Sequence, residues 1–188
     1  MSHKEAQKRL LVVWLVSVAT VLSILLLIVV APVAAADGHS RIAETIYGSF
    51  HILCHQLPER SYFIAGHKLA VCSRCTGLYA GFVFTMLLYP LLRPLRTVTW
   101  PPREWLILAA GPMAIDFSLT FFGVWENTHT SRLLTGILLG SASVFYVMPG
   151  LAELSLRKTS ASRPSFTLAS PERMASAPSD YSAPERRI

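Results

Sequence analysis

The chain has 188 residues, of which 52% are hydrophobic and only 15% are charged, and its mean hydropathy is +0.45. A soluble domain normally carries about 25% charged residues, and here the charges are missing from long runs, so the composition excludes an ordinary soluble domain and indicates a bilayer as the solvent. The net charge of +6 does not indicate a nucleic-acid partner, because the Lys and Arg residues form short clusters between apolar runs, as topology signals do.

The first uncharged run covers residues 10–36 and follows a basic N-terminus, residues 1–9. About 20 apolar residues cross a bilayer core, so the run predicts a transmembrane anchor. The alanines before Asp37 also resemble a signal-peptide cleavage site, but the apolar part of a signal peptide is only about 7–15 residues long. We therefore favour a retained anchor over a cleaved signal peptide; both place residue 37 outside the cytoplasm.

The next segment, residues 37–75, is the predicted extracytoplasmic Cys/His segment. Its apolar residues recur at helical spacing over 41–55, which predicts a short amphipathic helix along the membrane surface. These residues are Ile42, Ile46, Tyr47, Phe50 and Leu53. His51 and His55 are four residues apart and would share one face of that helix.

All three cysteines lie in this segment, as Cys54 and a Cys72-x-x-Cys75 pair. An odd number does not fit a framework held by disulfides alone. Three thiols and one imidazole match a Cys₃His zinc shell, and the two-residue gap is the usual chelate spacing. The predicted metal ligands are therefore Cys54, His55, Cys72 and Cys75, with His51 or His67 as alternative nitrogen ligands because adjacent residues rarely both reach one metal.

Two other interpretations of the thiols stay open. The Cys72-x-x-Cys75 pair is also typical of a redox-active dithiol, because a helix start and the charge of Arg74 both lower a thiol pKa and the outside of a bacterial membrane is oxidising. Quinone-linked enzymes that generate disulfides use such a pair, but they usually add a second cysteine pair, whereas here only Cys54 is present. The third interpretation is that the thiols only pack in a loop.

Three more spans are predicted at 76–92, 105–125 and 133–154, joined by loops 93–104 and 126–132. With the anchor and the amphipathic helix, they predict an all-α integral membrane protein built as a small bundle of four transmembrane helices. Two glycine pairs with helical spacing, Gly77/Gly81 and Gly136/Gly140, predict that the spans carrying them pack closely near their outer ends.

Asp116 lies near the middle of the span at 105–125. An ionisable group inside a membrane is costly, which makes it a functional candidate by default. Arg74 and Arg132 are its predicted partners, and Glu126 belongs to the same outer region. The candidate catalytic residues are therefore Asp116, Arg74, Glu126 and Arg132; the alternative is that Asp116 is a passive carboxyl bonded to a neighbouring hydroxyl.

Basic residues cluster at 4–9, 93–103 and 157–163. Because cytoplasmic loops carry an excess of Lys and Arg, both termini are predicted to be cytoplasmic, in a multi-pass protein of a bacterial or archaeal cell (inner) membrane. Residues 155–188 are rich in Ser, Ala, Pro and Arg and have no apolar period, so they are predicted to form a disordered cytoplasmic tail.

Two stretches resemble a family of uncharacterised prokaryotic membrane proteins catalogued as domain of unknown function 2085. They are Cys54-His55-Gln56-Leu57-Pro58-Glu59-Arg60-Ser61 and Cys72-Ser73-Arg74-Cys75-Thr76-Gly77. The residues around Asp116 and from Glu126 to Gly136 also resemble it, so the resemblance covers about 45–150. It implies that the motif residues form one unit and that the anchor and tail are additions to a three-span core. Phe117 departs from the glycine expected after the aspartate, which leaves less room near Asp116.

These observations predict a membrane protein with a zinc-like metal site at the extracytoplasmic mouth of a helical bundle. The lipid bilayer is its expected partner, and a lipid or quinone-like small molecule is the expected substrate class if the protein is an enzyme. Two alternatives remain: a thiol oxidoreductase that uses Cys72 and Cys75, and a non-catalytic subunit or small transporter in which Asp116 lines a pathway. Composition and motifs give neither the reaction nor the oligomeric state.

Overall fold

A computed structural model describes residues 3–160 of the chain. These residues form five α-helices and a small hairpin, and four of the helices are long and apolar enough to cross a membrane. The predicted all-α membrane fold is thereby confirmed. In chain order the elements are α1 (His3–Ala36), α2 (Ser40–His51), η1 (Pro58–Arg60), β1 (Phe63–Ile64), β2 (His67–Lys68), α3 (Ser73–Leu92), α4 (Arg103–Phe121) and α5 (His129–Ser160).

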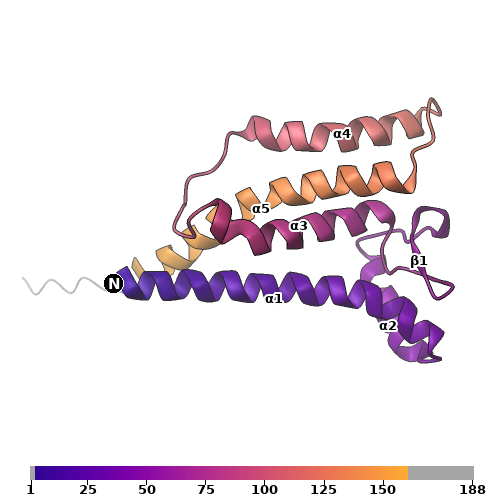
Figure 1. Cartoon of the computed structure of the whole chain (residues 1–188), viewed down its shortest axis with the longest axis horizontal. Coiled ribbons are helices and arrows are strands. Elements are labelled where there is room, and N and C mark those ends of the chain that lie inside the picture. Colours follow the sequence, from indigo (N-terminus) through magenta and orange to yellow (C-terminus); the bar gives the residue numbers. More distant parts are fainter. Residues whose placement is uncertain (1–2, 161–188) are drawn as a thin grey trace, which may run out of the picture.

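The four long helices lie alongside one another, and α2 and the hairpin lie at one end of the bundle (Figure 1). The starts of α3 and α5 and the end of α4 meet at that same end. We call it the cysteine end, because it contains Cys54, Cys72 and Cys75. The hairpin is antiparallel, with Phe63 opposite Lys68.

Helices α3 and α5 form the most closely packed pair of the described chain, through their glycines. A Cβ added at any of these four glycines would lie closer than 3.0 Å to a backbone carbonyl oxygen of the other helix. Gly77 faces Leu133, Gly81 faces Ile137, Gly136 faces Arg74 and Gly140 faces Leu78. The prediction that these two spans pack closely at their glycine pairs is therefore confirmed.

This contact should be sensitive to a single methyl group. We expect Gly81→Ala or Gly140→Ala to lower the free energy of unfolding by about 1–3 kcal/mol, because the backbones must move apart. Gly111→Ala on α4 is the matched control, since a Cβ there meets nothing within 4 Å. Thermal unfolding of the purified variants in detergent checks this; an equal melting temperature in all three would contradict the close approach.

Helix α1 packs against the rest of the bundle. Ile28 and Ala31 are fully buried, and the indole Nε1 of Trp14 donates to the carbonyl of Met86 on α3 at 2.9 Å. The helix begins at His3, before the apolar run at 10–36, because the Lys, Glu, Ala, Gln and Arg residues that precede the run are good helix formers. Retention of the segment as an anchor stays a prediction.

The amphipathic helix α2 is shorter than predicted. It ends at His51 rather than at residue 55, and Gln56 then adopts a left-handed backbone with a φ of 51°, which no helix can contain. His55 therefore lies beyond the helix and does not share a helical face with His51. Ile46 and Phe50 pack in one buried cluster with residues of α1 such as Ile28, so part of the apolar face contacts protein.

The last two helices also differ from their predicted bounds. Helix α4 ends at Phe121, four residues before the predicted end at Trp125, because Gly123 takes a left-handed φ of 68° just after the helix. Helix α5 begins at His129 and continues to Ser160, so residues 155–160 of the predicted disordered tail are helical. The remainder of that tail lies outside the described residues.

Candidate functional site

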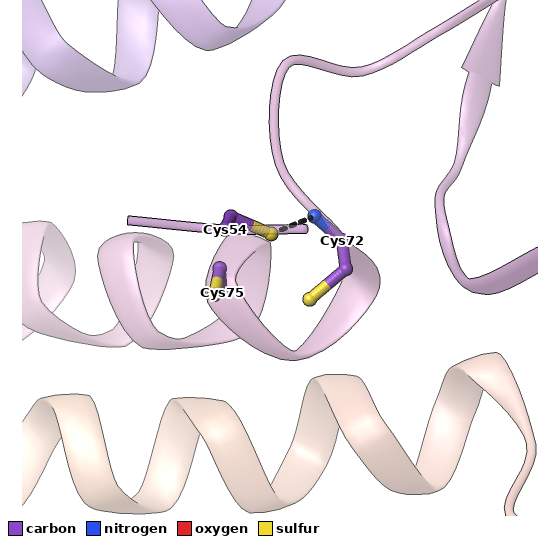
Figure 2. Close-up of side chains that lie close together, drawn as sticks. All are labelled: Cys54, Cys72 and Cys75. Atoms are coloured by element: carbon purple, nitrogen blue, oxygen red, sulfur yellow. Dashed lines mark hydrogen bonds between the residues drawn. The ribbon is translucent and has the colours of Figure 1, made fainter. Parts of the chain in front are cut away.

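The three cysteines come together at the cysteine end. Their sulfur atoms all lie within 4.8 Å of one another, and none forms a disulfide. Cys54 is buried and comes from the loop after α2, whereas Cys72 precedes the first residue of α3 and Cys75 lies in its first turn. The backbone N–H of Cys72 donates to Sγ of Cys54 at 3.2 Å (Figure 2). Two segments that are distant in sequence thus contribute to one thiol cluster.

Electrostatics favours a thiolate at Cys54. Hydrogen bonds from the thiols of Cys72 and Cys75 to the Cys54 sulfur hold the pKa of the Cys54 thiol below its usual range, although burial opposes this. A thiolate is the form that binds a metal and the form that attacks a disulfide. The cluster is therefore chemically competent for either of the two predicted thiol functions.

Gln56 fixes the loop that carries Cys54. Its side chain is buried, and its Nε2 donates to the carbonyl of Tyr47 at 2.7 Å. Its own carbonyl accepts from Nζ of Lys68 at 2.7 Å. These bonds tie the loop to α2 and to the hairpin. The sequence analysis did not assign Gln56 a role. The feature that could have indicated one is its position directly after Cys54-His55, in the motif that resembles the family.

The predicted histidine ligands lie apart from the sulfurs. His51, His55 and His67 are exposed, and the metal-ligand cluster found among residues 3–160 consists of the three cysteines. His55 does line the cavity onto which the cysteines open. A nitrogen ligand therefore stays a prediction, and His55 is the histidine best placed for it.

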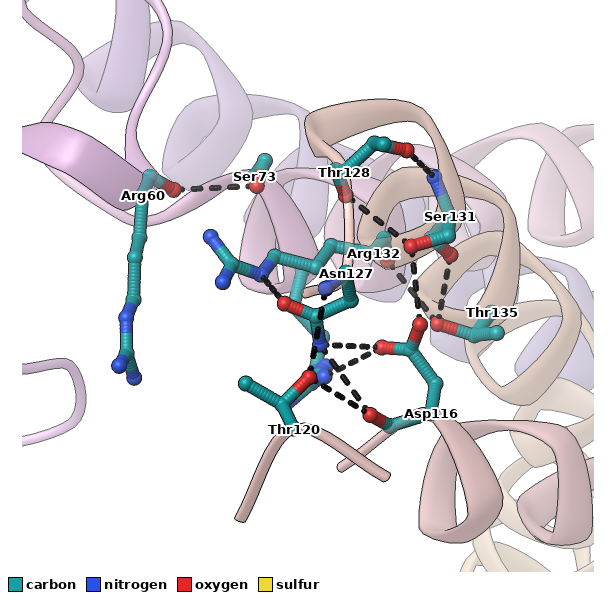
Figure 3. A network of polar contacts seen from close by, with 10 residues as sticks. Arg60, Ser73, Asp116, Thr120, Asn127, Thr128, Ser131, Arg132 and Thr135 are labelled. Atoms are coloured by element: carbon teal, nitrogen blue, oxygen red, sulfur yellow. Dashed lines mark hydrogen bonds and ion pairs between the residues drawn. The ribbon is translucent and has the colours of Figure 1, made fainter. Parts of the chain in front are cut away.

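Asp116 is the centre of a polar network between α3, α4 and α5. Its Oδ2 accepts from Nη2 of Arg74 at 2.6 Å and from Nδ2 of Asn127 at 2.7 Å. Its Oδ1 accepts from the hydroxyl of Ser131 at 2.8 Å (Figure 3). The Asp116 side chain is only 12% exposed. Both oxygens of this largely buried carboxylate are thus satisfied, as burial of a charge requires.

Of the two predicted partners of Asp116, Arg74 contacts it directly and Arg132 reaches it through Asn127. Nε of Arg132 donates to Oδ1 of Asn127 at 2.6 Å. Glu126, the remaining candidate, is exposed on the loop beside this network. Asn127 was not among the candidate site residues predicted from the sequence, although its position between Glu126 and Arg132 was a signal that polar residues gather here.

The Phe117 side chain occupies space that would be empty if this residue were a glycine. The guanidinium of Arg74 lies over the Phe117 ring, 5.8 Å from its centroid, a distance at which a cation is attracted to an aromatic face. Arg74 is therefore held from two sides, by the carboxylate of Asp116 and by this ring.

A cavity of about 470 Å³ joins the thiol cluster to the polar network. Its volume falls in the range of small-molecule sites, about 300–1,000 Å³. Two of the candidate catalytic residues, Arg74 and Arg132, thus face the same space as the predicted metal ligands. The lining includes Cys54, His55, Cys72, Cys75, Arg60, Arg74, Arg132, Asn127, Phe117 and Phe121.

Comparison with known proteins identifies relatives of this region. The family model described as "Predicted membrane protein (DUF2085)" matches residues 54–146. The uncharacterized protein MJ1492 of Methanocaldococcus jannaschii is 38% identical over 117 residues, which are 62% of this chain and 75% of that protein. An uncharacterized protein of Methanothermobacter thermautotrophicus is 37% identical over 91 residues, which are 48% of this chain and 80% of that protein. No solved structure matches the chain.

Proposed function

This chain belongs to the DUF2085 family of predicted membrane proteins, and we propose that it binds a zinc-like metal ion through Cys54, Cys72 and Cys75. The matched residues begin at Cys54, so the family region includes all three thiols. The observation that carries the proposal is the approach of the three sulfurs to within 4.8 Å without a disulfide. Tetrahedral zinc with Zn–S bonds of about 2.3 Å needs its thiolates gathered around one point.

The surroundings of the sulfurs also fit a metal. The N–H of Cys72 donates to Sγ of Cys54, and hydrogen bonds of this kind orient the ligands and stabilise them as thiolates. We propose His55 as the fourth ligand, because it lines the same cavity. Without His55, the fourth position would face the cavity, as in catalytic zinc sites that keep one position for water or substrate.

The orientation that we propose places this centre outside the cytoplasm and both termini inside. Arg93 and Arg103, which bound the loop between α3 and α4, lie at the end opposite the cysteine end. At that end Arg96 also contacts His3, near the start of α1. An excess of basic residues at one end of a bundle supports a cytoplasmic location for that end.

A thiol oxidoreductase is the second candidate, and the observation that favours it is that Cys72 and Cys75 are free thiols whose sulfurs lie within 4.8 Å of each other. In that case Cys72 and Cys75 would alternate between two thiols and one disulfide, passing two electrons and two protons to an external disulfide or quinone. The two candidates differ in what the resting protein contains: a metal ion in the first, and a redox-active thiol pair without metal in the second.

Metal analysis separates the two candidates. We expect the wild-type chain, purified without chelator, to contain about one zinc ion per molecule. Mild acid should release it, because the thiolate ligands must be deprotonated to bind. Inductively coupled plasma mass spectrometry measures the metal. A zinc-free protein with a reversible Cys72–Cys75 disulfide would instead establish the oxidoreductase.

A further inference from the structure

We propose that the cavity at the cysteine end is an anion-binding site, which takes a phosphate group through Arg60, Arg74 and Arg132. This inference goes beyond the metal centre and does not depend on it, because it concerns the arginine-lined part of the cavity. All three arginines line the cavity. They come from three separate elements: η1, the first turn of α3 and the first turn of α5.

The first argument is the balance of charge. The guanidinium groups of Arg60 and Arg74 repel that of Arg132, whereas Asp116 and Cys72 attract it. The nearby carboxylate, Asp116, does not line the cavity, and its oxygens are already occupied by Arg74, Asn127 and Ser131. Three guanidinium charges outnumber the nearby negative charges, the carboxylate of Asp116 and the thiolate of Cys54, and like charges repel one another. An anion in the cavity would remove that repulsion.

The second argument is the set of unused donors. Nε of Arg74 is buried, with no acceptor among the described residues. Arg132 uses its Nε on Asn127, and its terminal nitrogens point away from Asp116, toward the side where Arg60 lies (Figure 3). Arg60 makes no side-chain hydrogen bond or ion pair within residues 3–160; only its carbonyl is engaged, by Ser73. Guanidinium donors arranged in this way suit the oxygens of a phosphate group.

The third argument concerns an apolar part of the ligand. Phe117 and Phe121 line the same cavity and are mostly exposed, at 54% and 73%. They lie near the end of α4, a helix long and apolar enough to span a membrane. The end of such a helix lies at the level of the lipid headgroups. A cavity lined by both arginines and exposed aromatic rings fits an amphiphile with a phosphate head. Free phosphate shares the same chemistry, and the experiment distinguishes the two sources.

The test uses the full chain in nanodiscs and three variants. Arg60→Gln removes an exposed side chain that pairs with nothing in the described chain, so the variant should fold. Arg132→Gln removes a second donor. Arg41→Gln is the matched control, because Arg41 is exposed on α2 and does not line the cavity. Titration with inorganic phosphate, followed by thermal stabilisation, forms one arm; retention of phosphatidic acid in phosphatidylcholine nanodiscs, quantified by mass spectrometry, forms the other.

We expect the wild type and Arg41→Gln to bind alike, and Arg60→Gln and Arg132→Gln to bind about tenfold more weakly. Retention of phosphatidic acid identifies the amphiphile as the source, and stabilisation by phosphate without retention of the lipid identifies free phosphate. Binding that is absent in the wild type, or equal in all variants, overturns the proposal. Zinc measured in the same samples separates failure of this site from failure of the metal centre.

Discussion

Cys54→Ser, Cys72→Ser and Cys75→Ser should each abolish metal binding and loosen the segment at residues 37–74. A structural zinc site contributes about 10–16 kcal/mol of binding free energy in small domains, so this is the largest effect that we expect from a single substitution. The reason is geometric, because Cys54 follows α2 whereas Cys72 and Cys75 begin α3. A shared ion would tie these segments together. The measurement is zinc content together with protease resistance of residues 37–74.

Val71→Ala is the control for this experiment. Val71 is 1% exposed and packs in the same buried cluster as Cys54, so the change weakens packing beside the thiols without removing a ligand. It should keep zinc while losing some stability. If the cysteine variants keep their protease resistance, the thiols do not hold this segment. A dithiol behaves in that way, because a disulfide across two intervening residues constrains little of the unfolded chain.

Asp116→Leu should destabilise the bundle by about 3–5 kcal/mol, because removing one partner leaves the charge of Arg74 uncompensated. The two side chains are 12% and 22% exposed, and their nitrogen and oxygen atoms are 2.6 Å apart. Asp116→Asn should be milder, since the amide oxygen still accepts a hydrogen bond. The melting temperature of each purified variant in detergent gives the comparison.

Two further variants make the Asp116 result specific. Glu126→Gln is the matched control for Asp116→Asn, because Glu126 is an exposed carboxylate at the same end of the bundle. It should leave the melting temperature unchanged. The double variant Arg74→Leu, Asp116→Leu should be more stable than the sum of the single effects predicts, because no buried charge is left without its partner. Additive effects would show that the two side chains act independently.

Features that depend on local sequence were predictable from the chain. Long uncharged runs revealed the four spans, and paired glycines at helical spacing revealed the contact between α3 and α5. The intramembrane position of Asp116 led directly to Arg74, because a costly charge needs a partner of opposite sign. The runs and the glycine pairs are patterns of residues close together in sequence, and the need for a partner of Asp116 follows from the cost of a charge in the bilayer.

Features that depend on tertiary position were not predictable. The left-handed backbone of Gln56, in the loop that follows α2, is accompanied by contacts with Tyr47 and Lys68, and nothing in the spacing of the apolar residues indicated them. Asn127 and Ser131 bond to Asp116 only because α4 and α5 are neighbours. The sequence analysis also placed the metal ligands and the arginines in two separate groups, whereas the fold opens both onto one cavity.

The glycine contact between α3 and α5 has a mechanical consequence. The two helices cannot slide or separate without losing their backbone approach, so they act as a rigid frame that carries Arg74 and Arg132. Helix α4 is different, since Ala109 is its one buried residue in the described chain, and near the cysteine end it is fastened mainly through Asp116. The Asp116–Arg74 pair therefore fixes this end of α4 against the frame formed by α3 and α5.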